Sequence, residues 1–300
     1  MVFLRQIGFG EKLENPVARI VLVADDSPTI QKKAVGILKG EGFEVETVSN
    51  GVAAIRRLAV LHPVVILADV SMPGRDGYEV CEFVKTSAEL SQVPVLLVAG
   101  NHEFDARELN DAWPALAEHC ARLDIRLLER ASLVMNDSRG RRIRFVATIR
   151  WADFDVFGVA QRDKAMRAAS YFQRVMRATQ RGEPFDAAAV RAEGLACRAW
   201  LHAELTRPEP CDATVVLTHF APSLRSGDPR YGMQPTTASF CNADDDLLPL
   251  ADLWLHGHVH CRHDYMHVHA RGQTRVVCNS RGLASRGEAL THDSALIIEV

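Results

Sequence analysis

The sequence predicts an α/β protein whose front part is built on a parallel sheet. Short apolar runs of the length of buried strands occupy residues 20–24, 43–48, 64–68 and 93–98. Amphipathic stretches that suit helices lie between them, at residues 28–40, 51–61 and 76–87. Short buried strands that alternate with helices favour parallel pairing through right-handed crossovers.

The rest of the chain predicts an α/β sandwich. We expect a helix over about 105–122, a hairpin at Arg139-Gly140, a long helical stretch over 159–205 broken near Gly182, and short strands in the last third. Residues 1–17 read as a leader, 18–99 as a front half and 100–300 as a back half. No Pro/Gly/Ser-rich linker separates the halves, so we expect one continuous α/β unit that shares the strand at 93–98.

Composition excludes several classes of protein. A net charge of −3 gives no electrostatic reason to expect nucleic acid or a membrane as a partner. No segment approaches the ~20 apolar residues of a membrane helix. The seven cysteines are odd in number and never spaced as C-x-x-C. This usage favours a reducing, cytoplasmic location.

Carboxylates follow two of the front strands. Asp25 and Asp26 come directly after the first apolar run, and Asp69 follows the third, ahead of Met72-Pro73 and Asp76-Gly77. This pattern resembles the receiver domain of bacterial response regulators over about residues 18–99. The resemblance implies Mg²⁺ at the acidic pair, phosphorylation of Asp69 and a histidine kinase as partner.

The receiver pattern is incomplete at two positions. Ala99 stands where the family carries a hydroxyl at the end of strand four. The lysine of strand five is absent, and we expect the chain to turn away at Gly100 before any fifth receiver strand.

Three further motifs follow apolar runs in the back half: Gly100-Asn101-His102-Glu103, Thr218-His219 and Gly257-His258-Val259-His260. In this order they resemble the C-terminal part of the calcineurin-like metallophosphoesterases, from about residue 93 to the end. Arg281, in the late Cys-Asn-Ser-Arg-Gly stretch, belongs to the same resemblance. The Asp-x-His and Gly-Asp-x-x-Asp motifs that normally open this family are missing.

The two resemblances together imply one metal site, because parallel strands end at the same edge of a sheet. Its expected ligands are Asp25, Asp26, Asp69, Asn101, His219, His258 and His260. Mixed carboxylate and imidazole ligands suit manganese, iron or zinc, whereas the receiver interpretation requires magnesium. Ser27 stands where the family has a histidine, which leaves one coordination position weak.

The leading hypothesis is a metal-dependent phosphoesterase-like hydrolase that acts on a small phosphomonoester or phosphodiester. His102 would protonate the leaving alkoxide, Glu103 would orient the ring of His102, and Arg281 would contact phosphate.

The alternative is a phosphorelay signalling protein that is phosphorylated at Asp69 and has a catalytically degenerate back half. A third hypothesis is a recombined chain with neither activity intact. If Asp69 and His258 lie close enough to bind one ion, the hydrolase hypothesis is favoured. If they face separate clefts, the signalling hypothesis is favoured.

Overall fold

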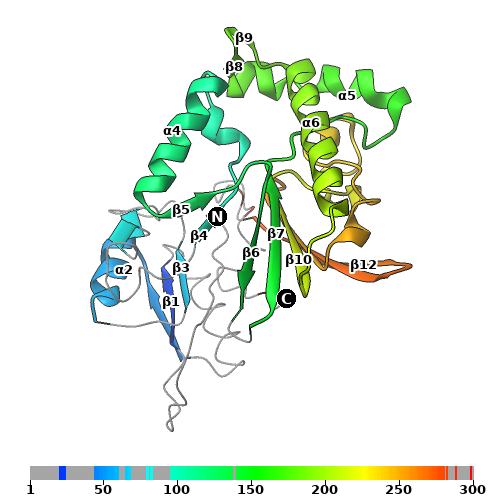
Figure 1. The fold of residues 1–300 in the computed structure, drawn as a ribbon. Coiled ribbons are helices and arrows are strands. Elements are labelled where there is room, and N and C mark those ends of the chain that lie inside the picture. The colour runs from blue at the N-terminus through cyan, green and yellow to red at the C-terminus, as the bar shows by residue number, and fades with distance from the viewer. Residues whose placement is uncertain are drawn as a thin grey trace.

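The computed structural model describes residues 20–24, 44–60, 65–68, 79–80, 82–83, 95–137, 140–280, 282, 288 and 298. Within these ranges the protein is α/β, as the sequence predicts, with helices packed around sheets (Figure 1). No described helix combines the length and apolar character needed to cross a membrane.

The front sheet is parallel, with the order β2-β1-β3. Its strands are β1 (Ile20–Ala24), β2 (Glu44–Val48) and β3 (Val65–Ala68). Helix α2 (Gly51–Leu58) follows β2, and the Asn50 side chain caps it by accepting the Ala53 N–H at 2.8 Å. The predicted parallel front sheet is therefore confirmed. The helix predicted at 28–40 lies outside the described residues.

Strand β4 (Val95–Leu97) pairs in parallel with β5 (Ile125–Leu127), and helix α4 (Leu109–Arg122) crosses between them. One buried cluster contains Leu97 of β4, Cys120 of α4 and Ile125 of β5. Its packing holds β5 beside β4. The prediction that the chain leaves before a fifth strand is therefore wrong. The residues after β5 are Leu128, Glu129 and Arg130, so the receiver lysine is still missing there.

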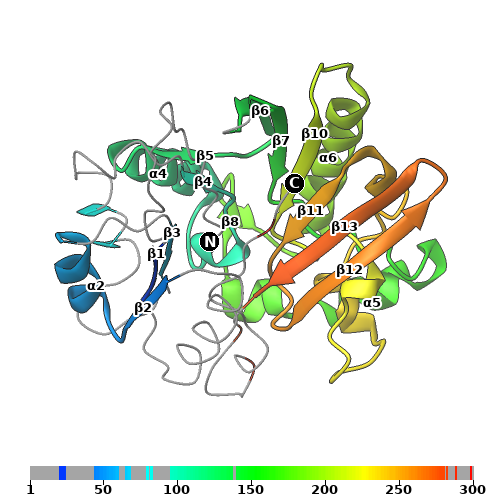
Figure 2. The same cartoon turned by 90° about the horizontal axis from the view of Figure 1, so that it is seen from below.

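A larger, mixed sheet has the order β12-β13-β11-β10-β7-β6. Its strands are β6 (Ala131–Asn136), β7 (Arg142–Thr148), β10 (Ala213–Thr218), β11 (Leu253–His256), β12 (Arg262–His269) and β13 (Gly272–Asn279). The inner strands are parallel, and the outer strands β6 and β12 run antiparallel to their neighbours (Figure 2). The predicted hairpin near Gly140 is the β6–β7 pair.

The predicted helical stretch at 159–205 is divided into α5 (Arg162–Ala168), a π-helical turn η3 (Phe172–Met176), and α6 (Ala187–Thr206). Between η3 and α6 lie the short strands β8 (Thr179–Gln180) and β9 (Glu183–Pro184). Gly182, with φ of 78°, forms the turn between β8 and β9. Short 3₁₀ turns complete the described chain: η1 (Asn101–Phe104), η2 (Val159–Gln161), η4 (Leu224–Ser226), η5 (Pro235–Ser239) and η6 (Leu248–Leu250).

The strand at 93–98 was expected to be shared by both halves of one continuous α/β unit, but the described strands of the two halves do not form a single sheet. They fall into separate sheets, and within the described ranges β4 pairs with β5 and not with β3. Antiparallel β6 closes one edge of the larger sheet, so β7 offers no free edge to the front strands.

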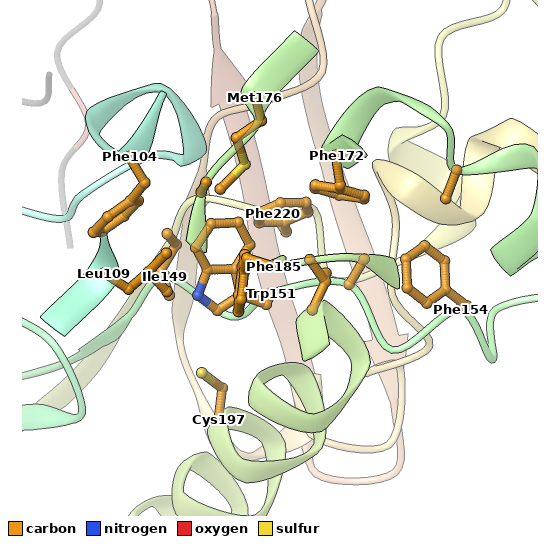
Figure 3. Packing of buried hydrophobic residues seen from close by; sticks show 14 of the residues in the cluster. Phe104, Leu109, Ile149, Trp151, Phe154, Phe172, Met176, Phe185, Cys197 and Phe220 are labelled. Carbon is orange, nitrogen blue, oxygen red and sulfur yellow. The ribbon is translucent and has the colours of Figure 1, made fainter. Parts of the chain in front are cut away.

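An aromatic cluster joins the loops above the larger sheet to the start of α4. Figure 3 shows Trp151 between Phe104, Phe185 and Phe220, with ring centroids 5.2–5.8 Å apart. These four rings are at most 2% exposed. Such burial of aromatic surface is a major source of stability.

The guanidinium of Arg150 is fully buried beside this cluster. Two of its nitrogens donate to Asp244, at 2.8 and 2.9 Å, and one donates to Asp153 at 2.7 Å. The remaining donors reach the carbonyl oxygens of Trp151 and Gly194, both at 2.9 Å. Burial alone would lower the pKa of Arg150, but the two carboxylates outweigh it and raise the pKa.

Replacement of Arg150 by methionine should lower the free energy of unfolding by about 3–5 kcal/mol, because it removes the buried cation that Asp153 and Asp244 share. Arg141→Met is the matched control, since Arg141 is 41% exposed and pairs with Asp137 at the surface. The control should cost less than about 1 kcal/mol. Urea denaturation measures both values, and equal losses in the two variants would contradict the role given to Arg150.

Candidate functional site

Three of the predicted ligand residues meet at the ends of β4, β10 and β11. The Asn101 Oδ1 atom lies 2.9 Å from His219 Nε2, which in turn lies 3.1 Å from His258 Nδ1. The parallel pairing explains the meeting, because Thr218 and His256 are register partners and the two histidines follow them closely. Asn101 is 1% exposed, and His219 and His258 are half-buried.

Hydrogen bonds set the direction of the lone pairs in this cluster. His258 Nε2 lies 3.0 Å from the Ser239 carbonyl oxygen and donates to it, which leaves Nδ1 unprotonated. Asn101 Nδ2 donates to Tyr171 Oη at 3.0 Å, which turns the amide oxygen toward His219. His219 Nε2 has one hydrogen at most and faces two acceptors, Asn101 Oδ1 and His258 Nδ1.

The arrangement fits a divalent cation. Separations of 2.9 and 3.1 Å between the donor atoms match the about 3.0 Å expected between neighbouring ligands of an octahedral ion that lies ~2.1 Å from each. Burial lowers the pKa of His219 well below its usual value and lowers the pKa of His258 to about 3. Both rings are therefore neutral, the form in which imidazole binds metals.

The backbone and neighbouring rings hold His258 in one orientation. Its φ of 66° is uncommon for a residue with a side chain. The ring stacks on Phe240 with centroids 4.9 Å apart and contacts Phe220 at 4.1 Å. Gly100 makes room for the other imidazole, because a Cβ atom there would lie 2.7 Å from His219 Cε1.

The predicted contact between Glu103 and His102 is wrong. The tight turn of η1 folds the Glu103 carboxylate back onto the Gly100 N–H, at 2.5 Å. Asp105 takes the expected place, with Oδ2 2.8 Å from His102 Nδ1. His102 itself is 62% exposed. Its other ring nitrogen, Nε2, lies 3.4 Å from the Tyr171 hydroxyl oxygen.

His260 does not share the contacts of the three clustered residues. Its Nδ1 atom lies 2.8 Å from the Oε2 atom of Glu288, a carboxylate that is buried. Among the described residues, no group of three or more His, Cys, Asp or Glu side chains could hold a metal ion. The cluster thus consists of two imidazoles and an amide oxygen. The other predicted site residues, Asp25, Asp26, Asp69 and Arg281, lie outside the described residues.

Tyr171 is the site residue that sequence reasoning missed. It contacts Asn101 and lies 3.3 Å from His102 Nδ1, although it stands about seventy positions further along the chain. No motif or spacing points to it.

Residues 21–112 match the protein family described as response regulator receiver domain. This segment runs from β1 into the first turns of α4 and includes Asn101. The match gives no support to the metallophosphoesterase resemblance of the back half.

Named relatives agree with the family match. The segment is 37% identical to protein PilG of Pseudomonas aeruginosa over 79 residues, which are 26% of this chain and 58% of PilG. It is 33% identical to protein PilH of the same organism over 78 residues, 26% of this chain and 64% of PilH. The chain therefore spans about three fifths of each of these relatives.

One solved relative is the receiver domain of a signal transduction histidine kinase from Syntrophus aciditrophicus. It is 30% identical, and the match covers 36% of this chain and 90% of that domain, with a TM-score of 0.26. The sequence matches therefore support a response regulator receiver domain at residues 21–112.

Stability should fall on acidification because of His256, which is buried behind the cluster against Ser226. Burial lowers its pKa to about 4 from 6.5, so between these values only the unfolded chain takes up the proton. Stability is then lost as the pH falls through this window, by about 1.4 kcal/mol per pH unit for one such group.

His256→Gln should reduce this slope by about that amount, whereas His202→Gln, at an exposed position of α6, should leave it unchanged. Urea titrations at several pH values between 4 and 6.5 measure the slope. The same slope in wild type and His256→Gln would exclude this assignment.

Proposed function

We propose that this chain is a phosphorelay signalling protein whose front segment accepts a phosphoryl group at Asp69 from a histidine kinase. The observation that carries the proposal is the register of the front sheet, in which Ala24 pairs with Ala68. The next residues in the sequence are Asp25 and Asp69. The ends of parallel strands are where open α/β sheets bind ligands.

The transfer is balanced at phosphorus. The bond from phosphorus to the ring nitrogen of the kinase's phosphohistidine breaks, and a bond to an Asp69 carboxylate oxygen forms. Mg²⁺ held by Asp25, Asp26 and Asp69 would offset the charge on the phosphoryl oxygens. Ala99 is buried at the end of the fourth strand and has no hydroxyl, so the phosphoryl group must be sensed by other groups.

Asp69→Asn should abolish labelling of the protein by acetyl phosphate, because an amide does not form the acyl phosphate. Asp76→Asn, seven positions further along the sequence, is the matched control and should still be labelled. Incorporated phosphate that hydroxylamine releases is the measurement. Equal labelling of wild type and Asp69→Asn would refute the assignment of the phosphoacceptor.

A second candidate function, metal-dependent hydrolysis of a small phosphate ester, is favoured by the meeting of Asn101, His219 and His258. Manganese, iron or zinc suits these donors and would, when bound, lower the pKa of water and offset phosphoryl charge. The protonated form of His102, held by Asp105, would give a proton to the leaving alkoxide oxygen. The two functions share one site if Asp69 binds the same metal ion as Asn101, His219 and His258.

His258→Ala should lower the Co²⁺ bound by the purified protein, because it removes one of two converging nitrogens. His263→Ala should not, since the His263 ring contacts Cys261 Sγ at 3.1 Å and not the cluster. Elemental analysis after equilibration with Co²⁺ measures the content. The same content in wild type and both variants would remove the support for a metal in this cluster.

A further inference from the structure

Tyr171 connects the exposed and the buried parts of the candidate site. It stands between α5 and η3, and its hydroxyl oxygen accepts from Asn101 Nδ2 at 3.0 Å. The same oxygen lies 3.3 and 3.4 Å from the ring nitrogens of His102. The two rings meet edge to face with centroids 6.0 Å apart. One hydroxyl thus contacts both neighbouring residues of η1.

The direction of these hydrogen bonds follows from Asp105. Its carboxylate can only accept, so His102 Nδ1 donates to it at 2.8 Å and Nε2 keeps a lone pair. The Tyr171 hydroxyl can then donate to His102 Nε2, at 3.4 Å, which leaves the oxygen of Tyr171 as an acceptor toward Asn101. Of the two ends of the Asn101 amide, only the NH₂ group can donate a hydrogen bond to this oxygen.

The orientation of the Asn101 amide matters because its two ends have opposite character. A rotation of 180° about the terminal bond of the side chain would exchange the oxygen and the NH₂ group. In the observed orientation the oxygen lies 2.9 Å from His219 Nε2. The reverse orientation would turn two N–H groups toward the imidazole nitrogens and repel a cation there.

We propose that Tyr171 is a positioning residue that holds the Asn101 amide oxygen toward His219 and His258, in a direction set by Asp105 through His102. The inference rests on the proposed metal-dependent function of this cluster. An ordinary tyrosine hydroxyl keeps its proton near neutral pH. Removal of the hydroxyl leaves the amide free to turn.

The test compares Tyr171→Phe in two backgrounds. In the natural background, Co²⁺ affinity measured by calorimetry should fall about tenfold or more, as for other residues that orient a metal ligand. In an Asn101→Asp background the fall should be less than about twofold, because both ends of a carboxylate are oxygen. An equal fall in both backgrounds, or none in the natural one, would overturn the proposal.

Tyr265→Phe is the matched control, since it also loses a partly buried hydroxyl contact, to Ser226 Oγ at 3.0 Å. It should leave Co²⁺ affinity unchanged.

A second readout needs no metal. With ¹⁵N-labelled asparagine, the side-chain amide signals of Asn101 should shift or double in Tyr171→Phe and stay unchanged in Tyr265→Phe. If the wild-type protein binds no Co²⁺, the hydrolase proposal fails, and these signals alone decide the role of Tyr171. Identical Asn101 signals in wild type and Tyr171→Phe would then refute it.

Discussion

The buried guanidinium of Arg150 is the interaction on which the back half depends. Through it the end of β7, the middle of α6 and the loop at Asp244 are held to one another, with all five of its N–H donors used. The carbonyl oxygen of the preceding residue, Ile149, accepts from the backbone N–H groups of His219 and Phe220. The position of one cluster histidine is therefore fixed by the residue next to this buried charge.

Close backbone approach reinforces the same region. A Cβ atom on Gly194 of α6 would lie 2.6 Å from the Trp151 carbonyl oxygen, so α6 can sit on this segment only with glycine there. The strand ends that carry His219 and His258 are then brought together by the parallel register of β10 and β11. Packing, a buried charge and register together define the geometry of the imidazoles before any ligand binds.

The sequence was sufficient to predict the residues that follow parallel strands. His219 and His258 meet because apolar runs locate the ends of β10 and β11 and parallel pairing aligns these ends. Asn101 follows β4, which belongs to a separate sheet, so only the motif order and not strand pairing pointed to it. Contacts inside tight turns could not be predicted, because the 3₁₀ turn of η1 moves Glu103 away from His102 and brings Asp105 to it. Tyr171 was missed for a different reason: its contacts depend on where a broken helical segment folds back, which no local pattern encodes.

The aromatic cluster has a consequence for how such proteins are assembled. The receiver match ends at residue 112, yet Phe104, Leu109 and Ala112 are buried in the same core as Trp151 and Phe220. A receiver segment exchanged at this boundary would have to supply matching side chains or leave a hole in the neighbouring core. The receiver segment therefore cannot be exchanged independently of the residues that follow it. Substitutions at its buried C-terminal residues have to be matched by substitutions in the core of the back half.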